Sequence, residues 1–147
     1  MNELNEVDED LFLIIINFKN KKVKENISKI KFKHEVVHLD WTDKFYDLLA
    51  FSDVVITKAG PGVVAEALFF NKYIALFHYI PGQEKGVKDY IMDNKLGMYI
   101  KNPSDIKDVV KFSDKDRLHK SIRSFQEKNL VKNGAFWTTK NIENYFA

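Results

Sequence analysis

Short apolar runs alternate with helical patterns along this 147-residue chain, an arrangement typical of a parallel sheet covered on both faces. The clearest run is residues 11–16, Leu-Phe-Leu-Ile-Ile-Ile, which predicts a buried strand. Further strands are predicted at residues 35–39, 53–57, 73–77 and 98–100, and helices at residues 21–30, 43–51, 63–70 and 86–94. The pattern predicts one α/β domain over residues 1–147, with a doubly wound, Rossmann-like parallel sheet.

The helix ends are marked by residues of known preference. Thr42 is the expected N-cap of the helix at 43–51, because a threonine hydroxyl can accept a bond from a first-turn N–H group. Gly97 is expected to end the helix at 86–94. Pro103 and Ser104 open a remainder that is expected to be mostly helical.

The run of residues 57–67, Thr-Lys-Ala-Gly-Pro-Gly-Val-Val-Ala-Glu-Ala, carries the clearest candidate chemistry. It reads as the end of a strand, a glycine turn and the start of a helix. Gly60, Pro61, Gly62 and Val63 would form the turn, where glycines let a ligand approach the backbone and the first N–H groups of a helix attract a diphosphate. Glu66 follows one turn into the helix, placed to accept hydrogen bonds from two ribose hydroxyls.

A second polar loop, Pro81-Gly82-Gln83-Glu84, follows the next predicted strand. The carboxyl ends of parallel strands share one edge of the sheet, which is where open α/β sheets bind ligands. Gln83 and Glu84 are therefore candidates for binding sugar hydroxyls. Together the two loops indicate a nucleotide-sugar site.

Each candidate residue also has an ordinary structural use. A tight turn between a strand and a helix often requires glycine, and a glutamate early in a helix often satisfies free N–H groups and the helix dipole. Gln83 and Glu84 could be polar residues of an exposed turn. The joint occurrence of the two loops favours ligand binding.

The two loops, in this order and spacing, resemble the C-terminal, donor-binding half of GT-B glycosyltransferases. Residues 53–94 are most similar to monogalactosyldiacylglycerol synthases and bacterial processive diacylglycerol glucosyltransferases, and more distantly to the peptidoglycan-precursor N-acetylglucosaminyltransferase. The resemblance implies UDP-glucose or UDP-galactose as donor substrate, no metal or cofactor, and transfer of the hexose to a lipid acceptor at the cytoplasmic face of a membrane. It also implies that Trp41 and Thr42 hold the uracil ring, although Trp41 could instead belong to the core.

Three departures from this family pattern bear on activity. Val63 stands where threonine is usual, and Val87 stands where asparagine is common. The first strand of the donor half and its glycine-rich loop have no counterpart, because residues 1–10 are too polar for a central strand and look like the tail of the helix that would follow it. We expect an N-terminally truncated, split or degenerate domain, whose gap is closed by direct pairing of the flanking strands or by a strand from another chain.

The resembling enzymes bind the acceptor and place the catalytic base in an N-terminal domain. No catalytic residue is therefore assigned here, and we expect the chain to be inactive without such a domain or a partner chain that carries it. A non-catalytic binding or regulatory module derived from such a transferase is the alternative function. A third option is a different UDP-sugar enzyme, such as an epimerase. Val63, Val87 and the missing strand favour the module, whereas Glu66 and the Pro-Gly-Gln-Glu loop favour the transferase.

Composition narrows the remaining classes. Hydrophobic residues at 45% and charged residues at 30% indicate a folded globular protein. The net charge is only +2 and most aromatic residues fall in apolar runs, so nucleic-acid binding is not expected. The lysines between residues 19 and 33 could attract an anionic membrane surface or form a solvated helix face.

Other observations exclude particular sites and suggest a compartment. The chain has no cysteine, which excludes disulfides and thiolate metal sites, and its four histidines lack the spacing of metal ligands. No apolar run reaches the roughly 18 residues that a membrane span requires, and no signal peptide is recognised. The expected location is the cytoplasm, with peripheral contact at the inner membrane face as one option.

Overall fold

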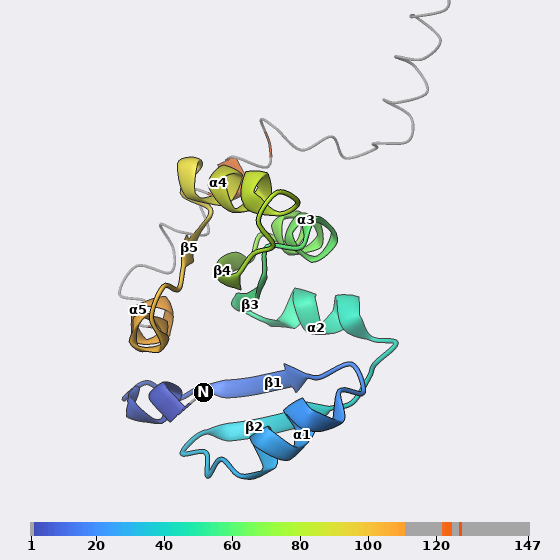
Figure 1. Cartoon of the computed structure of the whole chain (residues 1–147), viewed down its shortest axis with the longest axis vertical. Helices are drawn as coiled ribbons and strands as arrows, with labels where there is room; N and C mark the ends of the chain where they lie inside the picture. Colours follow the sequence, from blue (N-terminus) through green and yellow to red (C-terminus); the bar gives the residue numbers. More distant parts are fainter. Residues whose placement is uncertain (1, 111–121, 125–126, 128–147) are drawn as a thin grey trace, which may run out of the picture.

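The computed structural model describes residues 2–110, 122–124 and 127, and it has the expected alternation of strands and helices (Figure 1). The strands are β1 (Phe12–Ile16), β2 (Glu35–Leu39), β3 (Val54–Lys58), β4 (Tyr73–His78) and β5 (Gly97–Tyr99). The helices are α1 (Lys21–Ser28), α2 (Phe45–Phe51), α3 (Pro61–Phe69), α4 (Lys85–Asp93) and α5 (Ile106–Val110), with 3-10 turns η1 (Asn2–Glu6) and η2 (Pro103–Asp105). The observed elements confirm the α/β class predicted from the sequence.

The described strands form two parallel sheets rather than one continuous sheet. β1 pairs with β2, and β4 lies between β3 and β5. Direct pairing of β1 with β3, one of the two ways in which we expected the gap to close, does not occur among the described residues. Among the described strands, the sheet is therefore interrupted between β1 and β3.

The core is built around β4, the middle strand of its sheet. Ile74, Ala75 and Leu76 have no solvent exposure. Ile74 and Leu76 face a cluster that includes α3 and α4, whereas Ala75 faces the opposite cluster. That second cluster contains Leu4 of η1 and Val109 of α5. Helical elements thus cover both faces of β4, as the doubly wound prediction requires.

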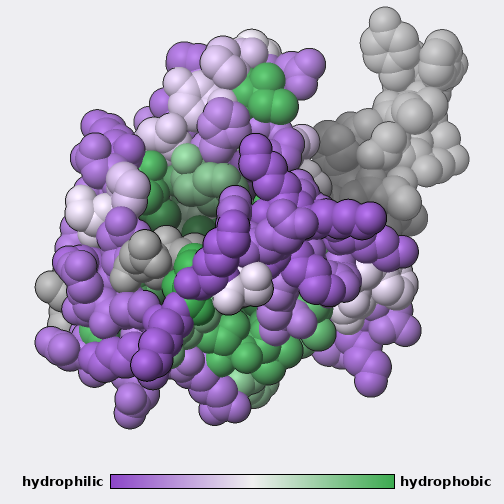
Figure 2. Space-filling view, turned by 60° about the horizontal axis from the view of Figure 1, so that its bottom comes forward, coloured by the Kyte–Doolittle hydropathy of each residue, from purple (hydrophilic) through white to green (hydrophobic). Residues whose placement is uncertain are grey.

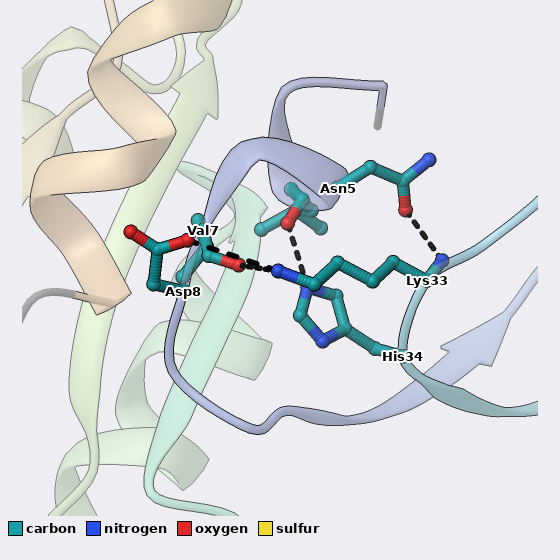
Figure 3. Close-up of polar contacts among 6 residues, drawn as sticks. Asn5, Val7, Asp8, Lys33 and His34 are labelled. Atoms are coloured by element: carbon teal, nitrogen blue, oxygen red, sulfur yellow. Dashed lines mark hydrogen bonds and ion pairs between the residues drawn. The ribbon is translucent and has the colours of Figure 1, made fainter.

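Residues ahead of β1 form a short turn that is fixed beside the beginning of β2 (Figure 3). Asn5 Nδ2 donates to the Lys31 carbonyl oxygen at 2.8 Å, and Asn5 Oδ1 accepts from the Lys33 backbone N–H at 2.8 Å. Lys33 Nζ donates to the Val7 carbonyl oxygen at 3.1 Å, and His34 Nε2 lies 2.8 Å from the Leu4 carbonyl oxygen. Leu4 and Val7 are each only 1% exposed. These residues form no strand, as their polarity predicted.

Two expectations about helix ends were wrong. Gly97 lies within β5 and does not cap α4; glycine is needed there because an added Cβ atom would lie 1.9 Å from the Ile74 carbonyl oxygen. The residue that turns the chain after α4 is Lys95, with a φ of 55°. Thr42 Oγ1 accepts from the Lys44 N–H at 3.0 Å, whereas the N-cap of α2 is Lys44.

Among the helices within the described residues, none is both long enough and apolar enough to cross a bilayer.

Candidate functional site

The β3–α3 turn and the β4–α4 loop are held together at the carboxyl ends of their strands. Lys58 Nζ donates to Glu84 Oε1 at 2.6 Å, and the Ala59 N–H donates to the His78 carbonyl oxygen at 2.8 Å. Glu84 Oε2 accepts from the Ile80 backbone N–H at 2.9 Å. The two motifs singled out in the sequence therefore meet, and a side-chain ion pair and a backbone hydrogen bond connect them.

Glu84 faces this contact rather than solvent. Its side chain is 6% exposed, whereas that of Lys58 is 51% exposed. The Lys58 ammonium, and next the Ile80 N–H, lower the pKa of the Glu84 carboxyl, because both stabilise its charged form. Pro81, Gly82 and Gln83 are exposed in the same loop. Both Glu84 oxygens already accept a hydrogen bond and the side chain is nearly buried, so its contact with a sugar hydroxyl stays a prediction.

The glycine turn has free space in front of it. Gly60 has a φ of −72°, and Gly82 is the one glycine of the described residues with a positive φ, at 85°. A Cβ atom added to Gly62 would meet no atom within 4 Å. The backbone conformation therefore does not require glycine at position 60 or 62, and the tight-turn explanation loses its basis there.

The first turn of α3 has the form expected of an anion site. Pro61 is the first helical residue, and the first helical bond runs from the Val64 N–H to the Gly60 carbonyl oxygen at 3.1 Å. The N–H groups of Gly62 and Val63 precede that bond, so helix geometry gives them no partner within α3. The N-cap residue, Gly60, has no side chain that could cap these groups.

Glu66 is oriented by a residue that sequence reasoning missed. Tyr46 of α2 donates its hydroxyl to Glu66 Oε1 at 3.1 Å, and its ring stacks on Phe70 at 6.3 Å. Glu66 raises the pKa of the Tyr46 hydroxyl by accepting this bond. Within the described residues no group bonds to Glu66 Oε2. Glu66 also lies beyond the first turn of α3, which contains no acidic residue, so the helix-capping alternative is not supported.

Trp41 and Thr42 lie in the loop between β2 and α2, just ahead of the helix that carries Tyr46. Trp41 is 59% exposed, which excludes the alternative that it belongs to the core. The adjacent Asp40 carbonyl oxygen accepts from the Lys19 N–H at 2.8 Å. The sequence could have suggested Tyr46 as a site residue by its position alone, since it follows the Trp41-Thr42 pair by about one helical turn.

No group of three or more histidine, aspartate or glutamate side chains suited to a metal ion occurs among the described residues.

Comparison with solved structures shows which fold carries this strand-turn-helix site. The structure titled "Crystal Structure Analysis of the Glycotransferase of kitacinnamycin" matches with a TM-score of 0.66. The match covers 92% of this chain and 43% of that one, at 12% sequence identity, and it establishes the glycosyltransferase-like fold.

The sequence comparisons then identify the family. The model described as "Glycosyltransferase family 28 C-terminal domain" matches residues 2–89, which is more than half of the chain. This chain belongs to that family.

The similar curated proteins are plant enzymes of glycolipid synthesis by name. Over 98 residues the chain is 38% identical to the monogalactosyldiacylglycerol synthase of Spinacia oleracea and 36% identical to synthase 1 of Arabidopsis thaliana, both chloroplastic. Each match covers 67% of this chain, but only 19% and 18% of the respective relative. The chain thus corresponds to about a fifth of the length of these enzymes.

Proposed function

We propose that this chain is the UDP-sugar-binding half of a glycosyltransferase that transfers a hexose, glucose or galactose, to a lipid acceptor. One observation carries the proposal. The Lys58–Glu84 pair connects the open glycine turn to the exposed Gln83 loop, and within the described residues Glu66, in the helix that follows the turn, has one carboxylate oxygen without a partner. A nucleotide-sugar needs a group for its diphosphate, a group for its sugar and a group for its ribose, and these three groups must lie close together.

Each part of the donor has a matching group in this arrangement. The diphosphate would lie against the Gly62 and Val63 N–H groups, where the α3 dipole stabilises the charge that develops on departing UDP. Glu66 Oε2 would accept from a ribose hydroxyl, and Gln83 would contact the sugar. Lys58, half exposed beside the turn, adds positive charge for the diphosphate.

The acceptor and the catalytic base would come from outside these 147 residues. The matched region is about a fifth of the synthases from spinach and Arabidopsis, and the described site contains groups suited to holding a donor. We therefore expect direct displacement of UDP by a lipid hydroxyl only when a second domain or a partner chain is present.

Titration of UDP into the ¹⁵N-labelled chain tests donor binding, with UMP as the matched control that lacks the second phosphate. We expect saturable amide shifts at Gly60, Gly62, Glu66 and Trp41 with UDP, and weaker binding of UMP. A folded spectrum that does not respond to millimolar UDP would contradict the proposal.

A non-catalytic binding module is the second candidate, and specific observations favour it. Val63 and Val87 stand where the resembling enzymes usually have polar residues, and β1 and β3 are not paired with each other among the described strands. The discriminating measurement is transfer. A companion acceptor domain from a relative should restore hexose transfer to the chain if it is half of an enzyme, and should not do so if it is a module.

A further inference from the structure

Positive charge is concentrated in one segment of the chain. Residues 19–33 contain seven lysines and one glutamate, a net charge of +6, so the rest of the chain carries −4, because the total is +2. The lysines of this basic segment are Lys19, Lys21, Lys22, Lys24, Lys29, Lys31 and Lys33. All seven are exposed. A surface with one sign of charge attracts a partner of the opposite sign.

The protein itself neutralises few of these charges. Lys24 Nζ lies 2.6 Å from Asp40 Oδ2, and Lys33 Nζ lies 3.8 Å from Asp8 Oδ1. The other five lysine side chains have no hydrogen-bond or ion-pair partner within the described residues. The basic segment therefore keeps most of its charge available for another molecule.

Helix α1 presents part of this charge to the outside. It has no buried residue, and the half-buried Ile27 marks its apolar side. At about 100° per residue, Lys21, Lys22 and the C-cap Lys29 lie on the opposite side of the helix. α1 lies at the lower end of the molecule in Figure 1, and Figure 2 brings that end forward, where hydrophilic residues cover most of the surface.

An exposed aromatic ring comes directly before the basic segment. Phe18 is 64% exposed, and Phe18 and Lys19 have positive φ values of 49° and 64°, which are uncommon for such residues. The Lys19 N–H donates to the Asp40 carbonyl oxygen at 2.8 Å, and the Asn20 N–H donates to the Asn17 carbonyl oxygen at 2.9 Å. These bonds hold a strained turn that leaves the ring in solvent, and strain of this kind is concentrated at functional sites.

We propose that Phe18 and the basic segment form a docking surface for a membrane that contains anionic phospholipids. Each lysine close to such a surface contributes about fivefold in affinity, because its ammonium group is attracted by the lipid phosphates. The Phe18 ring adds an apolar contact that charge alone does not provide, since aromatic side chains enter the boundary between headgroups and acyl chains.

A nucleic acid is a less suitable anionic partner. Residues 19–33 contain no arginine, which is the residue preferred for bidentate contacts with phosphates and guanine. The only aromatic residue among them, Phe32, is half-buried, whereas single-strand binding uses exposed rings on which bases stack.

Docking at this surface would bring the donor site to the membrane. Phe18 and Trp41 lie in neighbouring loops at the carboxyl ends of β1 and β2, because the Lys19 N–H bonds the residue before Trp41. In this respect the inference rests on the proposed function, whose lipid acceptor lies in a membrane. The acceptor would then be presented on the side of the sheet where Trp41 is predicted to hold the base.

Vesicle co-sedimentation of the 147-residue chain tests the surface directly. We expect binding to vesicles of phosphatidylcholine with about 30% phosphatidylserine, and at least tenfold weaker binding to phosphatidylcholine alone. Binding should be lost in about 0.5 M NaCl, because salt screens exposed charges. Equal binding to both kinds of vesicle, or binding to neither, would overturn the proposal.

Charge reversal locates the contact on the protein. Lys21→Glu with Lys22→Glu should weaken vesicle binding by at least about tenfold. The variant should remain folded, since glutamate is favoured in the first turn of a helix. The matched control, Lys95→Glu with Lys101→Glu, changes the net charge equally at exposed positions outside the basic segment and should have little effect. An equal loss in both double variants would overturn the proposal.

Phe18→Gly separates membrane binding from stability. Glycine adopts a positive φ without strain, so the variant should be no less stable than wild type in a thermal melt. It should nevertheless bind vesicles about fivefold more weakly, because the apolar contact is lost. Unchanged vesicle binding would overturn the proposal, and so would tighter binding of wild type to single-stranded DNA than to vesicles. None of these assays contains UDP, so failure of donor binding and failure of membrane docking are separate results.

Discussion

At the scale of single residues, the site depends on two contacts between distant parts of the chain. Glu84 bonds Lys58 and the Ile80 N–H, and Tyr46 bonds Glu66. Each contact holds in place a carboxylate that the sequence analysis predicts to bind the donor. They differ in one respect: Glu84 has both oxygens occupied, whereas within the described residues Glu66 retains a free one.

Glu66→Gln should weaken UDP binding by about 10- to 100-fold, because a hydrogen bond to a charged acceptor contributes about 1.5–3 kcal/mol. The melting temperature should change little, since Glu66 makes one partly exposed contact with Tyr46. Isothermal titration with UDP and a thermal melt measure the two effects.

Tyr46→Phe serves as the matched comparison for Glu66→Gln. It leaves Glu66 in place and removes only the hydroxyl that orients its carboxylate. UDP binding should weaken by less than about tenfold, which corresponds to a neutral hydrogen bond of about 1 kcal/mol. An effect as large as that of Glu66→Gln would assign Tyr46 a direct contact with the nucleotide instead.

Glu84→Gln should lower the melting temperature at neutral pH by a few degrees, because Lys58 loses its anionic partner. The pKa of Glu84 is lowered in the folded protein, so its stabilising contribution is complete above the ordinary glutamate pKa of about 4.3 and is lost as the pH falls through the folded value. The difference in melting temperature between wild type and variant should therefore shrink below about pH 4. A difference that stays constant with pH would show that Glu84 acts through packing alone.

At the scale of elements, two glycines at strand and helix positions have opposite roles. Gly97 lets β5 approach β4, since a Cβ there would come within 1.9 Å of the Ile74 carbonyl oxygen. Gly62 faces open space at the beginning of α3. One glycine is needed by the fold, and the other leaves room in front of the candidate phosphate turn.

Gly97→Ala should destabilise the domain by about 3 kcal/mol or more, because backbone must move to admit the methyl group. Gly62→Ala should be neutral or stabilising by up to about 1 kcal/mol, since alanine is favoured in a helix. It should nevertheless weaken UDP binding, because its methyl group would occupy the open space. Urea denaturation and UDP titration of both variants check the contrast, and unchanged UDP affinity in Gly62→Ala would place the nucleotide elsewhere.

At the scale of the whole molecule, the β1–α1–β2 unit is the less buried part of the described chain. α1 contributes no buried residue, and Lys24 on it pairs with Asp40 at 2.6 Å. The β3–β5 sheet, in contrast, has helices on both faces. Most of the described hydrophobic core therefore lies around the β3–β5 sheet rather than around β1 and β2.

Much of this architecture follows from local sequence. The apolar run at 11–16 and the motifs at 57–67 and 81–84 predicted strands and turns whose observed ends differ by one or two residues. Such elements are predictable because apolar periodicity, proline and glycine act within a few neighbouring residues. The same local signals misled at Gly97, where a helix cap and a close strand contact both call for glycine.

The sequence by itself determined the α/β class, the order of the elements and the loops that carry the candidate site, because these follow from periodicity and turn chemistry. Only the tertiary structure decided that Glu84 faces Lys58, that Tyr46 orients Glu66, and that β1 and β3 do not pair with each other among the described strands. The partners in these two contacts are 26 and 20 residues apart in the chain. Which side chains meet over such separations depends on how whole elements pack, and no local pattern records that.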